Sequence, residues 1–444
     1  MFGIVALNAW AGLKAGAATS DITPPVGAAM AGYFYNRAAT GVHDSLLARA
    51  LAFDNDGERI VLITCDLTNM PKGIADEVRA IVGRETKIPA SHVMVSATHA
   101  HTAPVLLSGW TRYALDGEFK RIADAYATVL PSRIAASAKQ AVANLREAKV
   151  RAAIGHEPGL AFNRRYIMQD GSVAWNPGKL NPKIVRPAGP IDPAVPLIYV
   201  EGVDGQPIAT YINFAIHLDT VGGTEFSADL AYSLSEAMKV ARGKQIVTLF
   251  TMGCAGNINH INTAKANKQS GHSEAARIGT TLASAVLNAM DGLAPIEDLK
   301  ISAGTATVSL NPVQPTPADI EQAHAAPPQS GATLVLAKAA RTLELEARGT
   351  APITAEVQVL RIGRELAWIA LPGEIFVELG LNLKQRSPAR YTMIATQSNA
   401  ALGYIPNADA YPQGSYEVVS SRLVQGSGEK LVDQAIQLLR EGNR

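Results

Sequence analysis

Two histidines separated by a single residue follow an apolar run, in Val-Met-Val-Ser-Ala-Thr-His-Ala-His-Thr at positions 93–102. Side chains two apart in an extended chain point the same way, so a segment that stays extended through His101 lets His99 and His101 face one point. Neutral imidazole is a common zinc ligand, and ligands of open α/β sheets bind at strand ends. The simpler interpretation is two hydrogen-bonded histidines at the mouth of a loop, so the question is whether further ligands arrive in the same way.

Further candidate ligands occupy the same kind of position. His217 ends an apolar segment, and Glu374 follows a predicted strand and a Pro-Gly breaker pair. We expect Glu374 to open a helix, whose N-terminus keeps a carboxylate ionised, as a metal ligand must be. Tyr404 lies just beyond another predicted strand, and the glycine-containing turn 253–260 follows a further one. Glycines in such a turn bring backbone N–H groups close to a ligand.

Two histidines and one glutamate with an open position describe a catalytic zinc site rather than a structural one. Zinc in such a site lowers the pKa of bound water to around 7 and polarises a carbonyl oxygen. Taken singly, each residue has a plainer alternative, which is a core histidine, a capping glutamate or a glycine turn. Their joint occurrence at several strand ends favours a hydrolytic metal centre.

The composition excludes several classes of function. The chain has 444 residues, and its 40 basic and 39 acidic residues leave no basic surplus to neutralise phosphates. No apolar run approaches the roughly 20 residues of a membrane-spanning helix. We therefore expect no nucleic-acid partner and no transmembrane segment, and the oligomeric state stays open. Residues 1–12 are an N-terminal extension or a signal-peptide remnant, which places the protein in the periplasm or outside the cell in the second case and in the cytoplasm otherwise.

Apolar, β-branched runs alternate with helical patterns, which predicts an α/β fold. We expect a layered sandwich of mixed β-sheets flanked by α-helices, with the active site at the C-terminal ends of strands. The predicted strands are 47–53, 59–65, 92–97, 150–154, 195–201, 208–215, 245–252, 300–310, 354–362, 366–371 and 391–396. The predicted helices are 73–86, 119–144, 230–238, 274–290, 317–322, 331–347, 374–387 and 429–441. Residues 160–196 are predicted to be a long loop that covers the site.

A set of short motifs occurs in a characteristic order. It comprises Asp-Ile-Thr-Pro at 21–24, Ser-Ala-Thr-His-Ala-His-Thr at 96–102, Asn-Arg at 163–164, Asn-Phe-Ala-Ile-His at 213–217, Pro-Gly-Glu at 372–374, Gly-Tyr at 403–404 and Tyr-Glu at 416–417. Together they resemble the catalytic domain of the neutral/alkaline non-lysosomal ceramidase family. The resemblance implies that residues 13–444 are a single ceramidase-like catalytic domain with a helical insertion around 312–350.

That family consists of zinc amidases that cleave the N-acyl bond of ceramide. The resemblance implies a single zinc ion held by His99, His217, Glu374 and Tyr404. It implies that His101, Arg164 and Tyr416 contact the substrate and stabilise the developing oxyanion. The histidine pair is thereby divided, with His99 on the metal and His101 on the substrate. For proton transfer to the leaving amine, His101 is the first candidate and His260 the second.

The sequence departs from the family at two points. In ceramidases the turn after the central strand carries an Asp-Val-Ser-Pro-like sequence whose serine has been proposed as a nucleophile, whereas this chain has Asn-Ile-Asn-His at 257–260, with Asn259 at the serine position. An amide cannot form an acyl-enzyme in that way, so we expect a metal-activated water to attack. The family also continues into a C-terminal β-sandwich domain, so this sequence resembles a shorter, bacterial-type member without it.

We therefore predict a zinc-dependent hydrolase that cleaves an N-acyl bond of a lipid-like or small-molecule substrate. The first alternative is a zinc-dependent deacetylase or esterase that acts on a carbohydrate or another small molecule. The second is a non-catalytic binding protein on the same fold. Trp110, Trp175 and the 160–196 segment suit either a lipid groove or a sugar platform, and the sequence does not choose between them.

Overall fold

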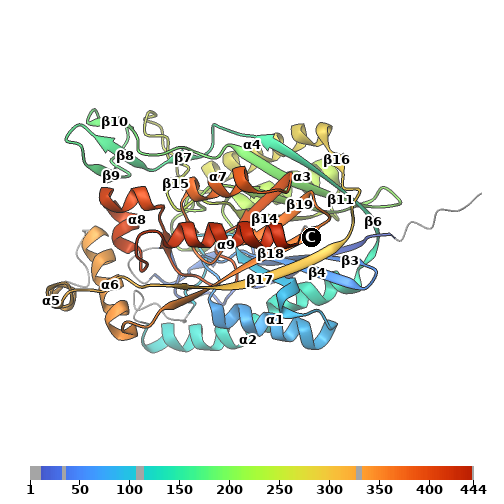
Figure 1. The fold of residues 1–444 in the computed structure, drawn as a ribbon, viewed down its shortest axis with the longest axis horizontal. Helices are drawn as coiled ribbons and strands as arrows, with labels where there is room; N and C mark the ends of the chain where they lie inside the picture. Colours follow the sequence, from blue (N-terminus) through green and yellow to red (C-terminus); the bar gives the residue numbers. More distant parts are fainter. Residues whose placement is uncertain (1–11, 33–36, 107–114, 327–332, 443–444) are drawn as a thin grey trace, which may run out of the picture.

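Figure 1 shows the computed structural model, which describes residues 12–32, 37–106, 115–326 and 333–442. The N-terminal extension predicted at residues 1–12 lies almost entirely outside these ranges, as does Trp110. No helix in the described ranges combines the length and the apolar character that crossing a bilayer requires.

One half of a nine-stranded sheet has the strand order β1-β3-β4-β5. Its members are β1 (Lys14–Asp21), β3 (Leu47–Asn55), β4 (Glu58–Cys65) and β5 (Val93–Ala97). β3 and β4 form a hairpin whose turn residues, Asp56 and Gly57, have φ of 53° and 85°, as the right-handed twist of the two strands favours. The helices α1 (Lys72–Thr86) and α2 (Gly117–Ala143) bury one face of this half, and α1 connects the parallel strands β4 and β5.

The other half of this sheet has the order β14-β12-β11-β6. Its members are β6 (Arg146–His156), β11 (Ala194–Gly202), β12 (Pro207–Phe214) and β14 (Val247–Met252), and β16 (Ala294–Pro295) pairs with β6. The helices α3 (Leu230–Arg242) and α4 (His272–Ala289) cover its outer face. The two halves join where Lys14 and Ala15 of β1 pair with Glu147 and Arg146 of β6, next to a hydrogen bond from the N–H of Ala148 to Leu13 O (2.9 Å).

A separate four-stranded sheet has the order β17-β18-β19-β21. Its members are β17 (Ile301–Leu310), β18 (Ile353–Ile362), β19 (Leu366–Ala370) and β21 (Tyr391–Ala395), of which β19 and β21 are parallel. The helices α7 (Val377–Arg386) and α9 (Ser427–Glu441) cover its outer face. In Figure 1, α1 and α2 run along the lower side of the molecule, α3 and α4 lie at the upper side and α9 crosses the centre.

The inner faces of these three strand groups share one apolar core. Each group contributes a large buried ring, namely Phe53, Tyr211 and Trp368, and the ring centroid of Trp368 lies 5.9 Å from that of Phe53 and 6.0 Å from that of Tyr211. Truncating a buried tryptophan to alanine costs about 3–5 kcal/mol. This shared core therefore fixes how the three groups meet, and it confirms the prediction of layered mixed sheets with helices outside.

The chain that follows β21 ties the edges of the large sheet together. The backbone N–H of Thr396 donates to Met252 O of β14 (3.0 Å), and the N–H of Asn399 donates to Val95 O of β5 (2.8 Å). Between them, Gln397 O accepts from the N–H of Ala97 (3.1 Å). The carboxyl ends of β5, β14 and β21 are thereby held at one place.

Most predicted strands and helices are confirmed, and the differences are local. The strand β1 was not predicted, because its sequence Lys-Ala-Gly-Ala-Ala-Thr-Ser-Asp lacks the branched and aromatic residues typical of strands. The prediction of a long loop at 160–196 was wrong, since this segment forms a three-stranded antiparallel sheet of β10 (Ile184–Pro187), β8 (Arg165–Met168) and β9 (Val173–Trp175).

The remaining elements are short or lie in connections. The segment 312–350 holds the helices α5 (Pro317–Ala325) and α6 (Thr333–Arg348), and α8 is Ser415–Ser420. Three two-stranded pairs are β2 (Gly41–Val42) with β13 (Glu225–Phe226), β7 (Phe162–Asn163) with β15 (Ile258–Asn259), and β20 (Glu374–Ile375) with β22 (Tyr404–Ile405). Short 3-10 helices lie at Ala90–His92, Met290–Gly292 and Ala408–Gln413.

Candidate functional site

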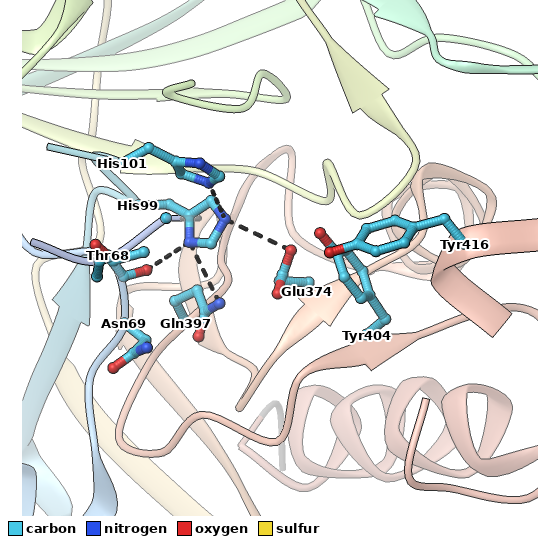
Figure 2. Close-up of a pocket in the computed structure, with 10 residues that line it drawn as sticks. Thr68, Asn69, His99, His101, Glu374, Gln397, Tyr404 and Tyr416 are labelled. Carbon is cyan, nitrogen blue, oxygen red and sulfur yellow. Dashed lines mark hydrogen bonds and ion pairs between the residues drawn. The ribbon is translucent and has the colours of Figure 1, made fainter. Parts of the chain in front are cut away.

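The two histidines of the His-Ala-His motif reach one cavity through a bend in the backbone. β5 ends at Ala97, and His99 has φ of 73°, so the prediction that the chain stays extended through His101 was wrong. The N–H of His99 donates to Leu67 O (2.9 Å) and that of His101 to Leu218 O (3.0 Å), which anchors the bend to the loops after β4 and β12. Both imidazoles line the cavity (Figure 2).

The hydrogen bonds of the imidazoles fix their tautomers. The Nδ1–H of His99 donates to Thr68 O, and the Nδ1–H of His217 donates to Ala255 O (3.0 Å). A neutral imidazole carries one proton, so the Nε2 atom of each ring presents a lone pair. The two Nε2 atoms lie 3.0 Å apart, and Nε2 of His101 lies 3.3 Å from that of His99. Lone pairs that face each other at this distance require a proton or a cation between them.

Glu374 supplies a carboxylate at the same point. Its Oε2 lies 3.5 Å from Nε2 of His99 and 3.4 Å from Nε2 of His217, and this buried oxygen has no hydrogen-bond partner among the described residues. The prediction that Glu374 opens a helix was wrong: residues 374–375 pair with Tyr404 and Ile405, and α7 begins at Val377. The pairing partner lies thirty positions away, so no local pattern revealed it.

The ionisation states of these groups are those of metal ligands. Burial and the neighbouring His99 lower the pKa of His101, and burial and Arg164 lower the pKa of His217. Burial alone would raise the pKa of Glu374, but the adjacent His99 and His217 hold it well below its usual range. Neutral imidazoles and an ionised carboxylate bind a divalent cation without losing a proton first.

The donor set fits a zinc ion. Donors about 2.0–2.1 Å from a tetrahedral metal lie about 3.3 Å from one another, close to the separations found here. His99, His101 and His217 form a group whose nearest ring nitrogens all lie within 4.8 Å of one another. The buried Oε2 of Glu374 faces His99 and His217 of this group and adds an oxygen donor to it. These residues are therefore a candidate metal centre, to which His99 and His101 come from the segment after β5, His217 from the segment after β12 and Glu374 from the segment after β19.

Tyrosine hydroxyls form the opposite wall. Figure 2 shows Tyr404 and Tyr416 on the side of Glu374 away from His99, with both hydroxyls directed toward the carboxylate. The Nη2 of Arg164 donates to the hydroxyl oxygen of Tyr404 (3.0 Å), and its Nε donates to Glu417 (2.9 Å). Burial and Glu374 raise the pKa of Tyr404 well above its usual value, while Arg164 opposes that rise.

Arg164 contacts Tyr404 from the side of the tyrosine that faces away from the cavity. It is buried, donates also to Gly256 O (2.7 Å), and does not line the cavity formed by the described residues, although Tyr404 does. Burial disfavours its charge, but Tyr404 and Glu417 raise the pKa of the guanidinium above its usual value. The structure therefore makes Arg164 a positioning residue for Tyr404, where the resemblance implied direct contact with substrate.

His260 lies outside the cavity wall. Its Nδ1 donates to Asp219 Oδ1 (3.0 Å) and its Nε2 donates to Gln269 O (2.7 Å), so both ring nitrogens are engaged and the ring carries a proton on each. Burial opposes that charge, and the Asp219 carboxylate raises the pKa of His260. With no ring nitrogen left for substrate, His260 supports the loop rather than transferring a proton. The neighbouring Asn259 is fully buried and donates to Asn176 (3.1 Å).

The cavity itself is small and polar. Its volume is about 60 Å³, and its lining residues are Ala31, Gly32, Thr68, Asn69, His99, His101, Glu374, Gln397, Tyr404 and Tyr416. Three of these residues, Thr68, Asn69 and Gln397, were not predicted as site residues. All three follow strand ends, Thr68 and Asn69 after β4 and Gln397 after β21, and this is the signal that identified His99 and His217.

The chain is similar to known proteins in the sequence of residues 13–221 and in its fold. Residues 13–221 match the sequence profile described as neutral/alkaline non-lysosomal ceramidase, N-terminal. A crystal structure of neutral ceramidase from Pseudomonas aeruginosa superimposes with a TM-score of 0.74 over 96% of this chain and 74% of that one, at 17% identity. A structure described as ceramidase complexed with C2 gives a TM-score of 0.76 over 97% and 76% of the two chains, also at 17% identity. No curated protein sequence matches the chain.

Proposed function

We propose, from the premise that residues 13–221 belong to the neutral/alkaline non-lysosomal ceramidase family, that this protein is a zinc-dependent hydrolase that cleaves N-acyl (amide) bonds. The observation that carries the proposal is the set of unprotonated donors aimed at one point, the Nε2 atoms of His99 and His217 and the orphaned Oε2 of Glu374. Two histidines, a carboxylate and an open position are the ligand pattern of catalytic zinc.

His99, His217, Glu374 and Tyr404 are the residues that would hold the zinc ion. Bound zinc supplies a water of pKa about 7 and polarises a carbonyl oxygen. The protein holds these donors in place through their other hydrogen bonds, since Thr68 O and Ala255 O orient the imidazoles and Arg164 orients the Tyr404 oxygen. Such partners typically contribute about 10–100-fold to metal affinity.

The remaining lining residues suit the other steps of amide hydrolysis. Burial lowers the pKa of His101, and its Nε2 faces the same cavity, so the ring can accept a proton from the attacking water and then pass that proton to the leaving amine. Tyr416 lines the same cavity, with its hydroxyl directed toward Glu374, and can donate a hydrogen bond to a developing oxyanion. A well-placed donor of this kind contributes about 3–4 kcal/mol. Asn259 offers no hydroxyl, which favours attack by water over an acyl-enzyme.

The size of the cavity favours a second candidate, a deacetylase or esterase that acts on a carbohydrate or another small molecule. The cavity formed by the described residues has a volume of about 60 Å³, which accommodates a short acyl group. Both candidates share the same chemistry and differ in the group attached to the carbonyl.

Metal analysis of the purified protein, combined with a screen of N-acyl amides, acetylated sugars and short esters, tests the proposal. We expect close to one zinc ion per chain and turnover of at least one N-acyl compound that stops on chelation and returns with zinc. Long-chain and short-chain amides in the same screen separate the two candidates. Absence of both zinc binding and turnover would contradict the proposal and favour a binding protein.

A further inference from the structure

We propose that Gln397 and Asn69 form a polar subsite, beside the candidate metal centre, that binds a hydroxyl group of the substrate. This inference rests on the proposed function and adds a specificity determinant to it. The two side chains line the same cavity as His99 and Glu374. Figure 2 shows both on the side of the His99 ring away from His101.

Gln397 has an unused polar group. The residue is only 2% exposed, and its Oε1 has no hydrogen-bond partner among the described residues. Its Nε2 lies 3.4 Å from Nδ1 of His99, whose proton already goes to Thr68 O. Rotating the amide by half a turn places the oxygen near His99 and leaves the NH₂ group unused instead. In either orientation one end of a buried amide lacks a partner, which is costly unless a ligand supplies one.

The backbone holds Gln397 in a conformation that a side chain makes unfavourable. Its φ is 51°, in the left-handed region that glycine adopts most readily. Its N–H donates to Gly373 O (3.2 Å) and its carbonyl accepts from Ala97 (3.1 Å), so contacts with two other segments impose this conformation. Strained backbone with an unsatisfied side chain is typical of functional positions.

Asn69 is the second member of the subsite. It follows Thr68, whose hydroxyl donates to Ala100 O (2.7 Å) and whose carbonyl accepts from His99, so the same loop that orients the metal ligand also places Asn69. Asn69 is half-buried and lines the cavity. The Asn69 amide and the unpaired end of the Gln397 amide therefore face the same space.

The chemistry of the subsite selects a neutral partner that both donates and accepts. No lysine or arginine is among the described lining residues, so the side chains beside Gln397 and Asn69 offer no countercharge for a carboxylate or phosphate. An amide presents a donor and an acceptor together, which matches a hydroxyl. A methyl group at the same place would leave the amides unpaired. The subsite therefore favours N-acyl compounds that carry a hydroxyl close to the scissile bond.

Matched substrate pairs test this specificity. N-(2-hydroxyethyl)acetamide against N-propylacetamide places the hydroxyl on the amine side, and N-ethylglycolamide against N-ethylpropionamide places it on the acyl side. In the native zinc-loaded enzyme, we expect a higher kcat/KM for the hydroxylated member of at least one pair. In Gln397→Leu that preference should fall about tenfold, mainly through KM, because one neutral hydrogen bond is worth about that factor.

Two further variants make the result decisive. Asn69→Leu should reduce the same preference, and it replaces Gln397→Leu if that variant fails to fold. Gln437→Leu, an exposed change on α9, is the matched control and should keep the native preference. Native discrimination in both Gln397→Leu and Asn69→Leu, or no preference for either hydroxylated compound in the native enzyme, would overturn the subsite.

Measurements of ligand affinity test the subsite independently of the proposed hydrolytic function. Calorimetry with the metal-free protein measures the affinity for the unreacted hydroxylated amides, and we expect an about tenfold weaker Kd in Gln397→Leu. If the native protein hydrolyses no amide but shows this difference in Kd, the subsite stands and the proposed function fails. If the native protein hydrolyses amides and the variants change neither preference nor Kd, the proposed function stands and the subsite fails.

Discussion

Two groups of histidine and carboxylate in the described residues have similar compositions and different geometries. In the first, His99, His101 and His217 surround Glu374, and their Nε2 atoms face one another in a buried cavity. In the second, His43 and His272 stack in nearly parallel planes, with ring centroids 3.6 Å apart and an interplanar angle of 9°. Lone pairs that lie in parallel planes do not converge on one ion.

The carboxylates of the two groups also differ in how many hydrogen bonds they accept within the protein. Asp44 of the second group accepts from the Ser227 hydroxyl (2.7 Å), the Ala228 N–H (2.7 Å) and His43 Nδ1 (2.8 Å), so its bonding capacity is used within the protein. Oε2 of Glu374 accepts from no donor among the described residues. The two groups therefore differ in the donor atoms that they leave unused and not in their residue types, and this difference makes the first group the candidate metal centre.

The largest expected effect comes from removing a donor of the first group. Replacing His217 with Ala should eliminate zinc binding and activity together, a loss greater than the about 10–100-fold that results from disturbing a ligand's hydrogen-bond partner. Zinc content by plasma mass spectrometry and turnover of the best substrate measure both. A folded variant with stoichiometric zinc and native turnover would show that the converging nitrogens are not a metal site.

A smaller effect is expected from changing Arg164, which holds the hydroxyl of Tyr404 beside the first group. Arg164→Lys should weaken zinc binding about 10–100-fold, because lysine cannot donate at once to Tyr404, Gly256 and Glu417 as Arg164 does. Competition with a chelator of known affinity measures the change. Arg165→Lys is the matched control, since Arg165 pairs with the same Glu417 (3.0 Å) without a recorded contact to Tyr404. Equal losses in both variants would refute a specific effect through Tyr404.

In the second group, the carboxylate should matter for stability alone. Asp44→Ala leaves the buried Ala228 N–H and Ser227 hydroxyl without their acceptor and should reduce the free energy of unfolding by about 1–3 kcal/mol. Asp44→Asn keeps one acceptor oxygen and should lose less. Urea denaturation measures the free energies of unfolding, and metal analysis measures the zinc content. Loss of zinc from the folded Asp44→Ala protein would place a metal in this group as well.

The smallest effect is expected from the stacked ring of His272. His272→Ala should change stability by no more than about 0.5 kcal/mol near neutral pH and leave zinc content unaltered. Burial and His43 lower the pKa of His272 below its ordinary value of 6.5, with Asp44 and Glu225 opposing the shift. The unfolded chain then takes up a proton first as the pH falls through 6.5, so acid destabilises the native protein more than His272→Ala. Parallel Tm profiles for the two proteins would contradict this.

The sequence reveals those features of the fold and the site that depend on local pattern. Runs such as 247–252 and 391–395 have the composition of buried strands, and His99 and His217 were found because they follow such runs. The roles expected for Arg164 and Tyr404 came from the family resemblance, because a tyrosine beyond a strand has no distinctive local signal.

Features that depend on distant pairing escaped prediction. Glu374 lies in a short pairing with Tyr404 rather than in a helix, and the left-handed turn at His99 depends on a hydrogen bond to Leu67 across the loop. The subsite residues Asn69 and Gln397 follow strands of two different sheets, β4 and β21. They line one cavity only after these sheets have packed together. Such contacts are tertiary, and single-sequence patterns do not encode them.

The positions of the four proposed zinc ligands along the chain have a consequence for how the protein is made. His99 and His217 leave the ribosome well before Glu374 and Tyr404. The later pair lies in the short β20–β22 pairing, which follows the four-stranded sheet along the chain, and that sheet must dock on the shared core before the set is complete. Closing loops of this length costs conformational entropy. The contacts formed when the sheets assemble offset this cost, and binding of the ion does not. A nascent chain halted before β19 should therefore bind zinc weakly, and metal retention reports on the completion of folding.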